Sequence, residues 1–223
     1  MRLIPGIPYR FEDPELLTQA LTHRSLGRHN YERLEFLGDS ILNFVVSARL
    51  YELKADNNEG ELSRLRARVV RGETLAAIAT GLKLSDYIRM DKGSMKSGGD
   101  KRGSILADAL EAIFGAIYID GGFEPCHSVI LHICGQFIAD LPEADELKDP
   151  KTRLQEWLQG QGHALPVYSL EREDGPPHKK HFQVQCVAAA AGISVTGQGS
   201  SRQKAEQAAA ATALEQVSLN PGR

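Results

Sequence analysis

The chain has 223 residues, of which 42% are hydrophobic and 25% charged, values typical of a globular protein in water. This length allows one large domain or two smaller ones, each with a buried core. No run approaches the ~20 apolar residues of a membrane-spanning helix, and residues 1–6 lack a signal-peptide core, so we expect neither a membrane span nor export. The three cysteines are too few and too irregularly spaced for a disulfide framework, which favours a reducing, cytoplasmic location.

The net charge of −3 argues, by itself, against a nucleic-acid partner. The charge is unevenly divided, however. Residues 149–223 hold 8 Lys and Arg against 7 Asp and Glu, a net of +1, whereas residues 1–148 hold 18 against 22, a net of −4. Clustered acids account for much of the negative part, and a bound cation would offset them. The overall charge therefore excludes no class of partner.

The first ~140 residues show the apolar periodicity and the start and stop signals of successive helices. Asp13-Pro14 is a typical helix opening, with Asp13 as the N-cap and Pro14 at the first helical position. We expect further helices at residues 31–53, 63–80 and 104–120, and a last one that ends near residue 140. Residues 93–103 are polar and glycine-rich, which predicts a loop between two of these helices.

Residues 141–149 are polar, lie beside prolines and lack periodicity, so we expect a linker there. Beyond it, residues 151–161 predict a helix. Alternating stretches at 167–173, 180–188 and 193–197 predict three short strands, the first two joined by a turn at 174–177. An alanine-rich helix is expected at 201–217. The second part of the chain is therefore predicted to have the order α-β-β-β-α.

Two acidic segments are the most informative part of the sequence. Glu32, Glu35 and Asp39 lie at positions i, i+3 and i+7 and share one face of the predicted helix. Asp108 and Glu111 repeat the i, i+3 spacing within a second, apolar helix. Like charges this close repel each other, and a divalent cation would turn the repulsion into ligation. Carboxylate oxygens are ligands that Mg²⁺ prefers, so the sequence predicts one magnesium site built from two helices.

These segments resemble the signatures of the ribonuclease III family, bacterial endonucleases that cut double-stranded RNA. Residues 32–40 match the family's ERLEFLGDS motif, and residues 104–112 match its SILADxxEA motif. The resemblance runs from about Phe11 to about Val217 and includes Glu59-Gly60 and residues 96–99. Residues 149–156 and 197–210 are similar to a double-stranded RNA-binding domain.

The resemblance implies an all-α endonuclease domain (residues 1–140), a linker (141–149) and a small α+β double-stranded RNA-binding domain (150–219). Glu35, Asp108 and Glu111 would ligate Mg²⁺, with Mn²⁺ able to substitute, and Asp39 and Glu111 would be catalytic. Hydrolysis would leave 5′-phosphate and 3′-hydroxyl ends with short 3′ overhangs, on ribosomal RNA precursors and structured messenger RNAs. The alternative for any single acid is a solvated helix face.

Glu32 and Glu59 match two further acidic positions of the family. Each of them has either a direct functional role or the role of an ordinary surface acid. If Glu32 is a surface acid, we expect it to form an ion pair with Arg33 or Arg64. Phe36 lies inside the first motif. In similar enzymes this aromatic residue enters the partner subunit of a homodimer, whereas the simpler interpretation is core packing. The Cys126-His127 and His132-x-Cys134 pairs lack zinc-ligand spacing, and we expect packing or surface positions for them.

In the second domain, A-form RNA would be recognised across its minor groove, mainly by shape. The resemblance implies contacts from the first helix, from the turn between strands and from the N-terminus of the last helix, where the helix dipole favours phosphates. The expected RNA-binding residues are Thr152, Gln155, Glu156, His178, Ser201, Arg202 and Lys204. Gln203 and Glu206 depart from the more basic pattern of many such domains.

Two other functions are alternatives to a double-stranded RNA endonuclease. A catalytically silent RNA-binding dimer would be favoured by the loss of a metal ligand, and none is lost. A processing enzyme for a narrow ribosomal RNA target would lack the RNA-binding module, which residues 149–217 supply.

Overall fold

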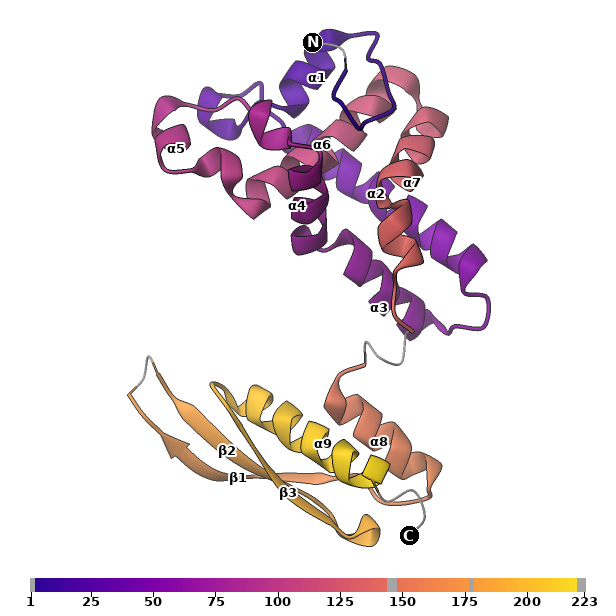
Figure 1. Cartoon of the computed structure of the whole chain (residues 1–223), viewed down its shortest axis with the longest axis vertical. Helices are drawn as coiled ribbons and strands as arrows, with labels where there is room; N and C mark the ends of the chain where they lie inside the picture. The colour runs from indigo at the N-terminus through magenta and orange to yellow at the C-terminus, as the bar shows by residue number, and fades with distance from the viewer. Residues whose placement is uncertain (1–2, 144–147, 177–178, 220–223) are drawn as a thin grey trace. The chain divides into compact units, whose positions relative to one another are not determined.

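The computed structural model describes residues 3–143, 148–176 and 179–219, and it divides into two compact units, Met1–Ala144 and Asp145–Arg223 (Figure 1). The first unit is helical. Its helices are α1 (Pro14–Ala20), α2 (Glu32–Leu53), α3 (Glu59–Val70), α4 (Gly72–Gly81), α5 (Lys92–Lys96), α6 (Gly103–Gly121) and α7 (Phe123–Ala139). Within the described residues, no helix is both long and apolar enough to cross a membrane.

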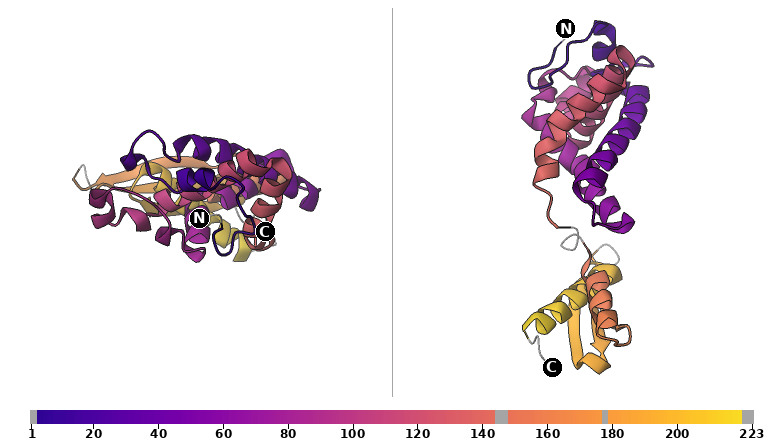
Figure 2. Two further views of the ribbon diagram at one scale, coloured as in Figure 1. Left: turned by 90° about the horizontal axis from the view of Figure 1, so that it is seen from above. Right: turned by 90° about the vertical axis from the view of Figure 1, so that its right-hand side faces the viewer.

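Helix α6 is the centre of the first unit. Its buried residues include Leu106, Ala107 and Ala112, which point to different sides of the helix, so the helix is covered by neighbours all round. Helices α1, α2, α4 and α7 pack against it, and Figure 2 shows the long helices of this unit lying alongside one another. The most extensive of these contacts is with α2, which brings the two acidic segments together.

Two sequence predictions for this unit were wrong. The single helix expected at 63–80 is divided into α3 and α4 at Arg71, whose backbone is extended (φ −63°, ψ 146°). The Thr74 hydroxyl donates to the carbonyl of Arg68 and stabilises this corner. The segment expected as a loop at 93–103 instead contains α5 and a 3-10 turn, Gly99–Lys101. Asp91 begins α5 by accepting from the backbone N–H groups of Gly93 and Ser94.

The second unit consists of α8 (Pro150–Gly160), β1 (Val167–Asp174), β2 (His181–Ala188), β3 (Ile193–Gly199) and α9 (Arg202–Leu219). The antiparallel sheet has the order β1-β2-β3, with a register shift in β1 between Leu170 and Arg172. Both helices cover one face of the sheet (Figures 1 and 2). The core between them includes Leu154, Leu158, Cys186, Val195, Ala209 and Ala213.

Candidate active site and RNA-binding surface

Two glycines let α2 and α6 approach each other closely. A Cβ atom at Gly38 would lie 1.8 Å from the carbonyl oxygen of Glu111, and one at Gly115 would lie 2.1 Å from that of Leu34. Contacts this short do not occur between real atoms, so only glycine fits at either position. The crossing point places one turn of α2 against the turn of α6 that carries the second acidic pair.

This crossing gathers three carboxylates. Oxygen atoms of Glu35, from α2, and of Asp108 and Glu111, from α6, all lie within 4.8 Å of one another, and the three side chains are partly buried. No cation forms an ion pair with them among the described residues. Three anionic oxygens at this separation, from partly buried residues, match the donor set that a hard divalent cation requires.

The charges in this cluster are unbalanced. Burial, together with the neighbouring carboxylates, raises the pKa of Glu35 to about 7 and that of Glu111 to about 8. Burial also raises the pKa of Asp108. A protein that simply folded around these acids would keep them neutral, whereas a bound cation would restore their charge. The electrostatics therefore favour a cation at this position.

The other predicted acids surround the cluster. Asp39 is exposed one turn beyond Glu35, and its Oδ1 accepts a 2.8 Å hydrogen bond from Asn43. Its charge contributes to the raised pKa of both Glu35 and Glu111, which places it near them. Glu32 is exposed and pairs with Arg24 at 3.7 Å, so neither of the partners expected for it is the one observed. Glu59 is exposed at the start of α3 and accepts from Ser63.

Sequence reasoning missed several of the residues that complete the surrounding cleft, such as His23, Arg24 and Ser94. This cleft has a volume of about 440 Å³ and is lined by Glu32, Glu35, Asp108 and several neutral and basic residues, among them His23, Arg24, Tyr31, Ser94 and Arg102. The Tyr31 hydroxyl donates to Asp108 Oδ2 at 3.4 Å. Tyr31 directly precedes the acidic helix, and that position was the available signal, whereas Arg24 lies in the separate 3-10 turn Arg24–Leu26.

Phe36 does not pack in the core of its own chain, because 78% of the residue is exposed. Phe44 and Tyr51, 60% and 75% exposed, follow it on the same side of α2. The three rings form an apolar stripe, and exposed stripes of this kind are typical of protein interfaces. Cys126 and Cys134 are buried free thiols, and they belong to no metal-binding cluster within the part of the chain that the structure describes.

In the second unit, α8 presents Thr152, Gln155 and Glu156 on one face. Asp149 caps the helix by accepting from the backbone N–H and the hydroxyl of Thr152, at 3.1 and 2.7 Å. The Thr152 hydroxyl therefore uses its proton internally and presents lone pairs to an incoming donor. Gln155 is exposed, and Glu156 pairs with Lys148 at 2.8 Å.

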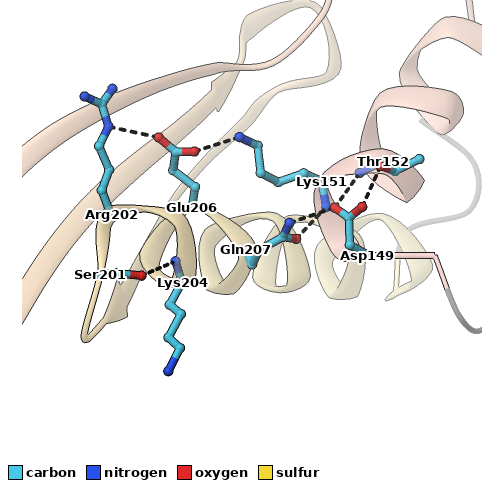
Figure 3. Close-up of polar contacts among 8 residues, drawn as sticks. All are labelled: Asp149, Lys151, Thr152, Ser201, Arg202, Lys204, Glu206 and Gln207. Atoms are coloured by element: carbon cyan, nitrogen blue, oxygen red, sulfur yellow. Dashed lines mark hydrogen bonds and ion pairs between the residues drawn. The ribbon is translucent and has the colours of Figure 1, made fainter. Parts of the chain in front are cut away.

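The N-terminus of α9 carries the other expected contacts (Figure 3). Ser201 Oγ accepts from the backbone N–H of Lys204 at 3.2 Å, and the side chains of Arg202 and Lys204 are exposed. Close packing against β3 fixes this end, because a Cβ atom at Gly199 would lie 2.6 Å from the backbone nitrogen of Ala205. His178 lies outside the described residues.

Comparison with known proteins identifies both units. Residues 13–136 match the family described as Ribonuclease-III-like, and residues 150–217 match the double-stranded RNA binding motif. Ribonuclease 3 of Alkalilimnicola ehrlichii is 52% identical over 209 residues, which cover 94% of this chain and 92% of the relative. Ribonuclease 3 of Vibrio cholerae is 50% identical over 217 residues, which cover 97% and 96%.

A solved structure is also similar. The nuclease domain of ribonuclease III from Campylobacter jejuni, described for flexibility in a region involved in dimer formation, is 42% identical with a TM-score of 0.58. The match covers 60% of this chain and 97% of that one. The predicted fold class, a helical nuclease domain followed by an α-β-β-β-α RNA-binding domain, is confirmed. The chain therefore belongs to the ribonuclease III family, the endonucleases specific for double-stranded RNA.

Proposed function

We propose that Glu35, Asp108 and Glu111 hold Mg²⁺, with Mn²⁺ able to substitute, and that the enzyme hydrolyses double-stranded RNA at this site. The observation that carries the proposal is the convergence of three uncompensated carboxylates from two helices. Magnesium bound there would neutralise phosphate charge and activate water for in-line attack. Arg24 and Arg102, which line the same cleft, supply positive charge for the RNA backbone.

Asp39 and Glu111 are the proposed catalytic residues. Asp39 is exposed beside the cluster, where one carboxylate oxygen has no hydrogen-bond partner among the described residues and could accept a hydrogen bond from the attacking water. Asn43 donates to the other oxygen and orients the group. Glu32 and Glu59 are assigned accessory roles, Glu32 by orienting Arg24 at the edge of the cleft. The expected products carry 5′-phosphate and 3′-hydroxyl ends.

We propose residues 1–140 as the catalytic domain, 141–149 as the linker and 150–219 as the RNA-binding domain. Thr152, Gln155, Glu156, His178, Ser201, Arg202 and Lys204 are the proposed RNA contacts. Ribosomal RNA precursors and structured messenger RNAs are the proposed substrates. These substrates, together with three buried free thiols, support a cytoplasmic location.

The experiment for this proposal uses the purified full chain and a long RNA duplex, with Mg²⁺ or with a chelator. Discrete cleavage with Mg²⁺, none with the chelator, and no cleavage of a single-stranded RNA of the same length are the expected results. End-labelling would identify the phosphate and hydroxyl ends. Duplex binding without cleavage at any Mg²⁺ or Mn²⁺ concentration would favour the catalytically silent RNA-binding protein instead.

A homodimer is part of the proposal, with Phe36 entering the partner subunit. Two sites in one dimer would each cut one strand, which accounts for short 3′ overhangs. Phe36→Ala should remove roughly 3–5 kcal/mol of packing per copy and shift the protein toward monomer at low concentration. Sedimentation measures the shift, and Leu165→Ala, at an exposed apolar residue of the second unit, is the control. An unchanged dimer would exclude Phe36 as an interface residue.

A further inference from the structure

Glu206, which departs from the basic pattern expected on α9, is held between two cations (Figure 3). Its Oε2 accepts from Lys151 Nζ at 2.7 Å, and its Oε1 accepts from Arg202 Nε at 3.0 Å. The side chain of Glu206 is only 14% exposed. The negative charge is therefore neutralised within the domain, and it offers little repulsion to an approaching phosphate.

The contact between Glu206 and Arg202 leaves the terminal Nη groups of Arg202 available to a ligand. Glu206 binds the Nε atom, and the two terminal Nη groups point away from Glu206 (Figure 3). The Arg202 side chain is 60% exposed. A guanidinium whose Nη groups face solvent in a fixed plane is suited to paired hydrogen bonds with phosphate oxygens, and fixing it beforehand lowers the entropic cost of binding.

Lys151 has a different role from Arg202. Its ammonium group lies on Glu206 and 4.5 Å from the centre of the Tyr168 ring, so it faces the domain and not a ligand. Its backbone N–H donates to Gln207 Oε1 at 3.1 Å, and Gln207 Nε2 donates to Asp149 Oδ1 at 2.8 Å. Consecutive residues of α9 thus tie it to the first turn of α8.

We propose that Glu206 is a positioning residue for duplex RNA, because it holds the Arg202 guanidinium so that its Nη groups face a phosphate. The inference rests on the proposed assignment of Arg202 as an RNA contact. It reverses the expectation from charge alone, because removal of a nearby acid should strengthen RNA binding if the acid only repels phosphate.

The test measures duplex binding by the full chain, in chelator so that no cleavage occurs, across a series of salt concentrations. Glu206→Gln keeps the shape but presents an amide N–H₂ to one of the two cations. It should weaken binding about 3- to 10-fold and reduce the slope of the salt dependence by about one phosphate contact, and Arg202→Ala should have the same effect. Glu215→Gln, which removes the same charge from an exposed position of α9, should change affinity less than about 2-fold.

A double variant separates positioning from a general structural effect. In the Arg202→Ala background, Glu206→Gln should weaken binding by less than about 2-fold, because the side chain that it aims is gone. In cleavage assays with Mg²⁺, Glu206→Gln should raise KM and leave kcat unchanged. If Glu206→Gln does not fold, Arg202→Lys, which keeps the charge but lacks the Nε donor and the fork, should show the same loss.

Three results would overturn the inference. If Glu206→Gln binds RNA as well as or better than the unsubstituted protein, while Arg202→Ala binds weakly, Arg202 is an RNA contact but Glu206 does not position it. Additive losses in the double variant would assign Glu206 to stability alone. Normal binding by Arg202→Ala would remove the RNA contact itself, and the inference with it.

Discussion

Partly buried carboxylates at two places in this protein have opposite electrostatics. At the crossing of α2 and α6, the carboxylates of Glu35 and Glu111 have a raised pKa because they are buried beside other acids. At the N-terminus of α9, Glu206 has a lowered pKa because Lys151 and Arg202 donate hydrogen bonds to it. The first arrangement is incomplete without an added cation, whereas the second is complete within the fold. The direction of the pKa shift thus distinguishes a site suited to binding a cation from an ion pair that stabilises the fold.

The largest expected effect comes from Glu111→Gln, which keeps the shape of the side chain and removes one anionic ligand. Cleavage should fall at least about 1,000-fold, or about 4 kcal/mol at the transition state, while duplex binding persists. Single-turnover cleavage in saturating Mg²⁺ measures the loss. Asp56→Asn, at an exposed acid of the same unit, is the control. Near-normal cleavage would show that Glu111 is not a metal ligand, and the proposed difference between the two regions would then be wrong.

Gly38→Ala tests the crossing that creates the first region. The added methyl group would meet the carbonyl oxygen of Glu111 at 1.8 Å, so the helices must separate, at a cost of about 3 kcal/mol or more in the free energy of unfolding. Urea denaturation of the first unit measures this cost. Gly135→Ala, inside α7 with open space around it, should be neutral or slightly stabilising. Equal effects of the two substitutions would contradict the close crossing.

A shortened chain of residues 1–147 tests whether the two regions act separately. It should retain Mg²⁺-dependent cleavage but require much lower salt, because the proposed phosphate contacts of the second unit are gone and the salt dependence of binding is shallower. Rates on one duplex at two salt concentrations measure this change. A folded dimer of this fragment that cuts at no salt or Mg²⁺ concentration would show that the second unit helps to build the active site.

The smallest effects concern stability without metal, and they should have opposite signs. In the folded protein the pKa is raised from 4.5 to about 7 for Glu35 and to about 8 for Glu111. The metal-free fold should therefore lose stability as pH rises from about 4.5 to about 8, because the folded state must then give up protons that it binds more tightly than the unfolded state. Glu206 has a lowered pKa, so its contribution is present above the unfolded value and lost as pH falls. At pH 8 in chelator, Glu111→Gln should raise the Tm of the first unit by a few degrees.

Under the same conditions, Glu206→Gln should lower the Tm of the second unit by a similar amount. Calorimetry of the full chain follows both units, and Mg²⁺ should stabilise the unsubstituted protein but not Glu111→Gln. Shifts of the same sign in the two variants would contradict the distinction between an unbalanced and a balanced carboxylate.

The sequence by itself determined the helical first domain, the α-β-β-β-α second domain and the pairing of two acidic helices. These features depend on local patterns: i, i+3 spacing fixes which carboxylates share a helix face, and alternation identifies the strands. The break at Arg71 was missed because no proline marks it, and its stabilising hydrogen bond from Thr74 forms only once the corner exists.

Only the tertiary structure decided how those faces meet. The closeness of Glu35 to Asp108 and Glu111 depends on Gly38 and Gly115, which lie 77 residues apart in the chain but allow two backbones to touch. Glu206 pairs with Lys151, which lies 55 positions away in the chain. The sequence therefore showed that an acidic residue replaces the expected basic one, but it did not show which cation neutralises that acid. The charge on a carboxylate is local, but its pKa and its role depend on which groups long-range packing places beside it.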